Sequence, residues 1–152
     1  MLPGFRSMLN IHPLFVHFPI AFWFAALLFE ALAVLRKNDA WHATAVRLLY
    51  LGTLAAFATV WTGWGAQNSV EPNMEIQHVF LIHEMTMLIT TSLATTLCLF
   101  HFLKRNSFTA GPRKILLAGL IILAILTAVG ADRGVQLVYQ YGQSVNGPNG
   151  EK

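Results

Sequence analysis

Four long apolar stretches, separated by short polar segments, dominate the pattern of this chain. They cover residues 14–35, 43–64, 79–103 and 115–131. Each is near the roughly 17–25 residues that a helix needs to cross a bilayer. Strands of a membrane barrel would be about 10 residues long with alternating polarity, so the pattern excludes them. It predicts an all-α fold, a transmembrane four-helix up-down bundle formed by a single domain over residues 1–152.

Proline and glycine mark the expected helix ends. Pro13 and Pro72 occupy positions suited to the first turn of the first and third helices, and Gly111-Pro112 opens the fourth. The fourth helix is expected to continue past Asp132 as a short interfacial C-terminal segment, 133–141, whose tyrosines suit the headgroup zone.

Composition points to lipid as the solvent. Only 11% of the 152 residues are charged, against about 25% in a soluble domain. The single cysteine, Cys98, lies inside the third stretch, where we expect a small core residue and no disulfide. The net charge of +3 comes from basic residues in short loops, so it does not indicate nucleic-acid binding.

The distribution of basic residues predicts the orientation. Four spans put both termini on one side, with the first and third loops on the other. The side of those two loops holds Arg36, Lys37, Arg47, Lys104, Arg105, Arg113 and Lys114, whereas the termini and the second loop hold Arg6, Arg133 and Lys152. By the positive-inside rule both termini face out, which in a bacterial inner membrane is the periplasm.

Histidines carry the candidate chemistry. The chain has six, and His12, His17, His78 and His83 fall near the starts of the first and third helices. Ionisable residues within a membrane span are costly and indicate function by default. The other two, His42 and His101, fall at the opposite side, where we interpret them as incidental; a second haem there is the sharper alternative.

His17 and His83 are the pair that we expect to bind a cofactor. Both are expected at similar depth on the outer side, and the first and third helices of an up-down bundle are usually diagonal neighbours. Two imidazoles facing each other across a bundle suit a b-type haem, which needs no covalent attachment motif. Arg6 and Arg133 lie on the same side and are candidates for pairing with the haem propionates.

Other interpretations stay open. A copper site could use His12, His17, His78 and His83 with nearby methionines, since imidazole and thioether suit copper. Alternatively the histidines are hydrogen-bonded structural groups or contact a quinone.

Further polar and small residues carry packing expectations. Glu30 is expected to pair with Arg36 or Lys37. Thr86 and Thr90 share a face with His83, so a threonine could hold its second ring nitrogen. The hydroxyl stripe of this helix is expected to bond to other helices, and the alternative is that it forms a cavity wall. Spacings of four at Gly52 and Ala56, Thr59 and Gly63, and Ala21 and Ala25 predict close helix packing.

Two motifs resemble a known family. The opening His-Pro-x-x-x-His-Phe-Pro at 12–19 and the closing Leu-Val-Tyr-x-x-Gly at 137–142 resemble the signatures of domain-of-unknown-function family 2231. His83 also falls where members commonly have a histidine. The resemblance implies four spans and an association with redox proteins, since relatives are fused to or encoded near cytochrome c or iron–sulfur domains. Members often carry an acidic residue after the glycine ending the second helix, whereas Trp64 follows Gly63 here.

The leading hypothesis is therefore a membrane redox subunit that passes electrons between the quinone pool and a periplasmic redox partner. The rivals are a non-catalytic membrane anchor or assembly subunit with structural histidines, and a periplasm-facing copper-binding protein. Homo- and hetero-oligomers are both compatible with the sequence. Hydrolytic enzymes find no support, because no Ser/His/Asp or metalloprotease spacing occurs.

Overall fold

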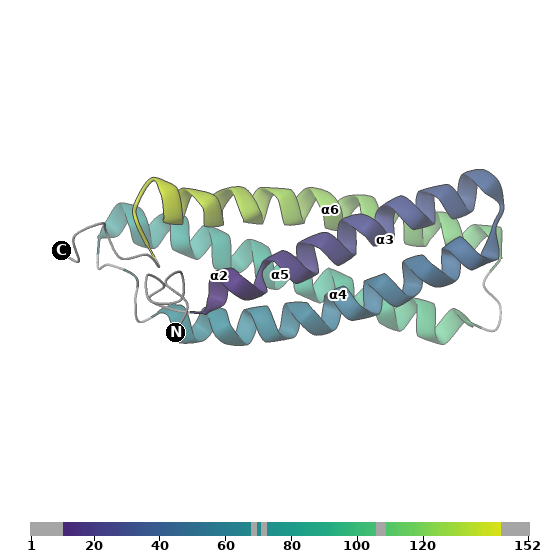
Figure 1. The fold of residues 1–152 in the computed structure, drawn as a ribbon, viewed down its shortest axis with the longest axis horizontal. Coiled ribbons are helices and arrows are strands. Elements are labelled where there is room, and N and C mark those ends of the chain that lie inside the picture. The colour runs from purple at the N-terminus through teal and green to yellow at the C-terminus, as the bar shows by residue number, and fades with distance from the viewer. Residues whose placement is uncertain (1–10, 68–69, 71–72, 106–108, 144–152) are drawn as a thin grey trace, which may run out of the picture.

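The computed structural model of the protein describes residues 11–67, 70, 73–105 and 109–143, and these are almost entirely helical. The elements are α2 (His12–Phe15), α3 (His17–Arg36), α4 (Asp39–Ala66), α5 (Met74–Lys104) and α6 (Ala110–Tyr139). With α2 and α3 taken together, four helices are long and apolar enough to cross a membrane. The predicted all-α membrane bundle is confirmed, and Figure 1 shows its long helices lying side by side along one axis.

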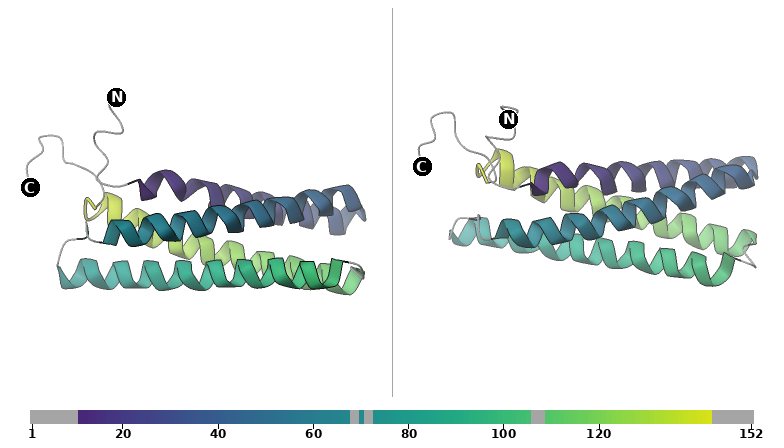
Figure 2. Two further views of the ribbon diagram at one scale, coloured as in Figure 1. Left: turned by 90° about the horizontal axis from the view of Figure 1, so that it is seen from below. Right: turned by 60° about the horizontal axis from the view of Figure 1, so that its bottom comes forward.

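The helices run alternately up and down around the bundle. α3 packs mainly on α4, and α5 packs mainly on α6, while contacts of α3 with α6 and of α4 with α5 close the ring. Within the described residues α3 and α5 do not contact each other, so the first and third helices are diagonal, as predicted. The views of Figure 2 agree with this arrangement.

The two ends of the bundle differ in character. The terminal end holds the start of α2, the start of α5 and the ends of α4 and α6 (Figure 1). The basic end holds the turn from α3 to α4 and the start of α6, with Arg36, Lys37, Arg47, Arg105 and Arg113.

Asparagine side chains start two of the helices. Asn38 accepts hydrogen bonds from the backbone N–H groups of Ala40 and Trp41, at 2.9 and 3.3 Å, and so satisfies donors at the start of α4. Asn73 does the same for Glu75 at 2.9 Å in α5. The expected start at Pro72 lies outside the described residues. Between α3 and α4, Lys37 adopts a left-handed conformation with φ of 50°, which ends α3.

The first span is not one unbroken helix. The helical hydrogen-bond pattern is interrupted at Val16, which itself keeps helical backbone angles (φ −60°, ψ −28°), so α2 is a single turn and His17 opens α3, whereas a continuous helix from Pro13 was expected. Pro19 explains the break, because it has no N–H to bond to the carbonyl of Phe15. That carbonyl instead accepts a hydrogen bond from Thr59 Oγ1 on α4 at 3.3 Å.

The last helix continues past Asp132 without interruption to Tyr139, so the predicted extension is confirmed but belongs to α6 itself. The chain then turns at Gly142, whose φ of 65° favours glycine. Tyr141 donates a hydrogen bond to Glu75 Oε1 at 2.7 Å and ties this turn to the start of α5.

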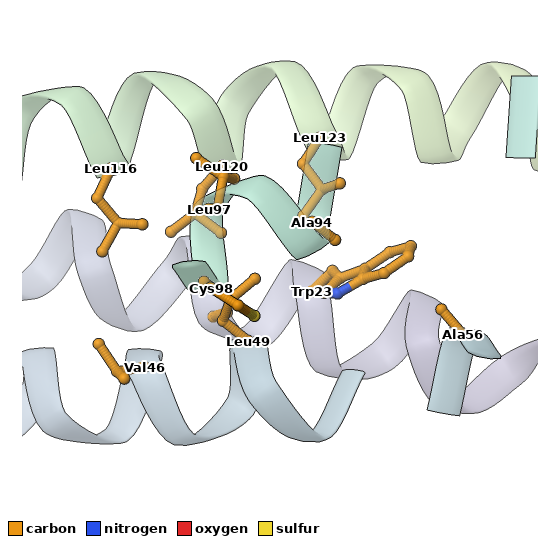
Figure 3. Packing of buried hydrophobic residues seen from close by; sticks show 11 residues of the cluster. Trp23, Val46, Leu49, Ala56, Ala94, Leu97, Cys98, Leu116, Leu120 and Leu123 are labelled. Atoms are coloured by element: carbon orange, nitrogen blue, oxygen red, sulfur yellow. The ribbon is translucent and has the colours of Figure 1, made fainter. Parts of the chain in front are cut away.

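The buried core lies along the middle of the bundle and is dominated by Trp23 and leucines from α4, α5 and α6 (Figure 3). Trp23 packs on Gly52, where an added Cβ would lie 2.7 Å from Trp23 Cδ1, and Ala56 on the same face is buried. This confirms the expected close packing along α4. The seam on α3 was placed wrongly, because Ala21 is exposed and Ala26 and Ala33 are the buried alanines.

The hydroxyl groups of α5 are satisfied within that helix, both in the core and on its surface. Hydroxyls of α5 donate to carbonyls four residues earlier in the same helix, not to other helices as expected; they belong to Thr90, Thr91, Ser92, Thr95 and Thr96. Cys98 is buried, as predicted, and its thiol contacts Thr53 Oγ1 at 3.4 Å. Large exposed apolar side chains such as Leu35, Leu54 and Trp61 face outward, which suits contact with the lipid bilayer.

Candidate functional site

A cavity of about 380 Å³ opens between the helices toward the terminal end. Most of its lining is apolar, from residues such as Ile20, Phe80 and Leu88. Groups able to hydrogen-bond or ligate also line it, and they include His12, His17, Trp23, His83 and Glu84. An apolar cavity with a few convergent polar groups is typical of a site for a small molecule or cofactor.

His12 reaches across to α4 from the short helix α2. Its Nδ1 lies 3.1 Å from the carbonyl oxygen of Thr59 and 3.3 Å from Thr62 Oγ1. The ring lies over Gly63, where an added Cβ would come within 3.2 Å of His12 Cε1. His12 is the first residue of α2, and its ring turns inward to line the cavity.

His83 makes the matching contacts on the other side of the cavity. Its Nδ1 lies 2.8 Å from the carbonyl oxygen of Gly130 on α6. The ring lies over Gly134, where an added Cβ would come within 3.0 Å of His83 Cε1. A threonine was expected to hold this nitrogen, but Thr90 bonds to the carbonyl of Thr86 in its own helix, so the backbone of α6 takes that role.

The surroundings of the two histidines repeat. Each ring nitrogen contacts the carbonyl of a residue 47 positions later in the chain. In both cases the glycine under the ring follows that carbonyl by one helical turn, at 63 after 59 and at 134 after 130. The first hairpin, α2 to α4, and the second, α5 to α6, therefore present equivalent imidazoles from opposite sides. Sequence reasoning missed this repeat, although the equal spacing was present to be found.

The two rings face each other at close range. The centroids of His12 and His83 are 6.4 Å apart, and the ring planes are inclined by 82°. A carbonyl oxygen only accepts hydrogen bonds, so Nδ1 carries the proton in both rings. In the neutral imidazole that tautomer leaves a lone pair on Nε2. The site therefore presents two nitrogens of the kind that ligate a metal or accept a proton.

The other expected site residues divide between the cavity and the surface. His17, the first residue of α3, lines the same cavity, whereas His78 is exposed and does not line it. Across the described residues no three or more His, Cys, Asp or Glu side chains lie together as a metal site. The copper interpretation required the four histidines at this end to converge on one point, and in the described residues they do not.

Neither of the two arginines expected to pair with haem propionates, Arg6 and Arg133, is among the described residues that line the cavity. Arg6 lies outside the described residues. Arg133 does not line the cavity, and its Nη1 donates to Gln136 Oε1 at 3.0 Å.

A second polar cluster, at the basic end, was not expected. Glu30 is completely buried, and its Oε2 lies 2.7 Å from His42 Nδ1. The predicted pairing with Arg36 or Lys37 is therefore wrong, and the partner is His42. His42 is correspondingly not incidental. Its ring centroid lies 5.7 Å from that of His101, whose Nδ1 is 3.3 Å from the hydroxyl of Tyr50.

Comparison with known proteins identifies the family without naming an activity. No curated protein matches the chain, and no solved structure matches it. One family model covers residues 8–147, nearly the whole chain, and it includes both motifs and all of the helices described above. The chain therefore belongs to the family described as predicted membrane protein (DUF2231).

Proposed function

We propose that this protein is a membrane redox subunit that holds a b-type haem in the terminal cavity, with His12 and His83 as opposing axial ligands. The observation that carries the proposal is the 6.4 Å separation of the two ring centroids. Iron–nitrogen bonds of about 2 Å, plus about 1 Å from each nitrogen to its ring centre, require roughly 6 Å between two axial imidazoles. When bound, the haem would supply a one-electron couple.

Hydrogen bonding around the two imidazoles supports this reading. Ligating histidines usually donate their other ring N–H to a carbonyl or carboxylate, which fixes the tautomer and the ring orientation. Here the carbonyls of Thr59 and Gly130 accept from Nδ1. Gly63 and Gly134 let each ring approach its supporting helix closely. His17 lines the same cavity and is the alternative ligand opposite His83.

A quinol is a second candidate ligand for the same cavity. Trp23 Nε1 is buried and has no hydrogen-bond partner among the described residues, so it offers a donor to a carbonyl oxygen. Glu84 lines the cavity and offers a proton acceptor. The imidazole nitrogens without protons would accept from a quinol hydroxyl. The cavity volume of about 380 Å³ lies within the range of small-molecule sites.

The orientation belongs to the same proposal. The basic end carries most of the arginines and lysines, which favours the cytoplasmic face of a bacterial inner membrane. The terminal cavity would then open toward the periplasmic side, where a periplasmic redox partner exchanges electrons with a subunit that also meets the quinone pool within the bilayer.

An absorption spectrum of the purified protein tests the proposal. We expect the sharp reduced band of a b-type haem, either as purified or after adding haem, and its loss in His12→Ala and His83→Ala. His78→Ala is the matched control, because His78 is exposed and lies outside the cavity. Loss in His17→Ala with retention in His12→Ala would assign the second ligand to His17.

Other spectra would reject the haem. A colourless protein that takes up no added haem would overturn the proposal. Binding of a quinol analogue by that protein, weakened by Glu84→Gln, would favour the second candidate. Copper in the purified protein, lost with His12→Ala, would revive the copper interpretation. Absence of every ligand would leave the role of a membrane anchor or assembly subunit.

A further inference from the structure

Glu30 is the most deeply buried ionisable side chain in the bundle, and the terminal cavity does not involve it. It is completely buried on α3, in the basic half of a membrane span. Its Oε2 contacts His42 Nδ1 at 2.7 Å, and its Oε1 has no hydrogen-bond partner among the described residues. An ionised carboxylate with one bare oxygen is costly inside a membrane protein, whereas a protonated carboxyl is much less so.

The histidine beside Glu30 connects it to the basic end. His42 and His101 both line a cavity of about 440 Å³, which opens at that end, while Glu30 is not part of its lining. Water in the cavity therefore meets Glu30 only by way of His42. A histidine suits this position, because its two nitrogens can take a proton on one side and release one on the other.

The charged groups around the cluster come from three helices. They are Asp39, Arg47 and Tyr50 on α4, His101 and Arg105 on α5, and Arg113 on α6, where Arg113 is paired with Asp39. Among the described residues, Asp39 is the only carboxylate that lines the cavity. The imidazoles of His42 and His101, whose planes are inclined by 55°, thus lie between Glu30 and the surface charges.

We propose that Glu30 is a proton-binding site that exchanges its proton with the cavity at the basic end through His42. On uptake, a proton from cavity water binds His42 Nε2, and the proton on Nδ1 passes to Glu30 Oε2. The carboxylate becomes a neutral carboxyl, and His42 is left neutral in its other tautomer. One proton enters and one carboxyl is protonated, so the step balances without any further reactant. This inference does not depend on the proposed haem.

Infrared spectroscopy of the full protein in lipid nanodiscs tests the proposal. We expect a protonated-carboxyl band that shifts when the protein is moved into heavy water, because the buried carboxyl exchanges its proton with the cavity at the basic end. Glu30→Gln should remove the band, and Glu30→Asp should shift it. Glu75→Gln is the control, since this exposed carboxylate lies at the terminal end and should leave the band unchanged.

The role of His42 is tested by following hydrogen–deuterium exchange of the same carboxyl group. In His42→Phe, exchange should be roughly tenfold slower or more, because the relay is lost. If His42→Phe fails to fold, heavy-water exchange of the band in the unmodified protein and in Glu30→Asp still decides. Absence of a protonated-carboxyl band that Glu30→Gln removes, lack of exchange of that band in the unmodified protein, or exchange that is equally fast in folded His42→Phe would overturn the proposal and leave a structural pair.

Discussion

At the scale of single residues, the side chains that matter most are held by neighbours that carry no chemical signal of their own. His83 is positioned by a backbone carbonyl and by a glycine, both from a helix 47 or more positions away. Glycine and carbonyl groups look alike everywhere in a sequence, so reasoning from residue type found His83 but assigned its partner to a nearby threonine. Glu30 was assigned to Arg36 or Lys37, which are closer in sequence, whereas its partner His42 is 12 residues away on the neighbouring helix α4.

Replacing Gly134 tests how tightly His83 is held. In a helix, alanine is favoured over glycine by about 0.8–1.0 kcal/mol. At Gly65 an added Cβ meets nothing within 4 Å, so Gly65→Ala should raise stability by up to about that amount. At Gly134 the Cβ would lie 3.0 Å from His83 Cε1, so Gly134→Ala should lose this gain or destabilise the protein. Thermal unfolding of both variants in detergent decides; equal stabilisation would contradict the close packing.

Tyr141 provides a prediction about pH, because it lies outside the membrane spans. Its hydroxyl donates to Glu75 Oε1 at 2.7 Å, and this hydrogen bond raises the pKa of Tyr141 above the ordinary value of 10.0. The folded protein therefore holds the phenolic proton more tightly than the unfolded chain. The resulting stabilisation is complete below the unfolded pKa and is lost as pH rises through the folded pKa.

The midpoint of thermal unfolding should therefore fall above about pH 10 in the unmodified protein, and Tyr141→Phe should remove that part of the decrease. Tyr139→Phe serves as the control, because Tyr139 is strongly exposed on the preceding turn. A decrease of the same size in Tyr141→Phe would show that the hydrogen bond to Glu75 contributes nothing to the pH dependence.

At the scale of elements, the lengths of the four spans were predictable because hydrophobic length alone sets them. The helices extend beyond the apolar stretches at most ends, since asparagine caps and interfacial residues continue them past the hydrocarbon. The break at Val16 was missed, although Pro19 already signalled it. The break bears on the site. The carbonyl of Phe15, which lacks a helical partner, accepts a hydrogen bond from Thr59, and the carbonyl of Thr59 in turn holds His12.

Restoring helical continuity in the first span should separate binding from stability. In Pro19→Ala, residue 19 gains an N–H that can bond to the carbonyl of Phe15 in place of the Thr59 hydroxyl, which should loosen the contact between α2 and α4 that holds His12. We expect haem content to fall while the thermal midpoint stays equal or rises, since proline is disfavoured in a helix interior by about 3 kcal/mol. An unchanged haem spectrum would show that the break does not position His12.

At the scale of the whole molecule, the up-down topology follows from four spans joined by short loops, and the diagonal placement of α3 and α5 follows from that topology. The two-hairpin repeat does not follow from this topology, because it depends on equal spacing between residues of different kinds in the two halves. This repeat gives the bundle its polarity: equivalent histidines meet at the terminal end, whereas a glutamate and histidines meet at the basic end.

The orientation of that polarity decides which compartment each site faces. If the positive-inside rule holds, residue 140 is periplasmic and residue 111 is cytoplasmic. In a Cys98→Ala background, Gln140→Cys should react with a membrane-impermeant maleimide added to intact cells, whereas Gly111→Cys should react only after permeabilisation. Both positions are exposed, and a side chain at Gly111 meets nothing within 4 Å, so neither change should disturb packing.

Labelling of both variants after permeabilisation is the control for reactivity. The reverse pattern would place the histidine cavity on the cytoplasmic side and would remove a periplasmic redox partner from the proposed function. It would also reverse the side from which Glu30 takes its proton, because the cavity that leads to His42 lies at the end marked by residue 111. The same experiment therefore assigns both sites to a compartment, since one rigid set of helices connects them.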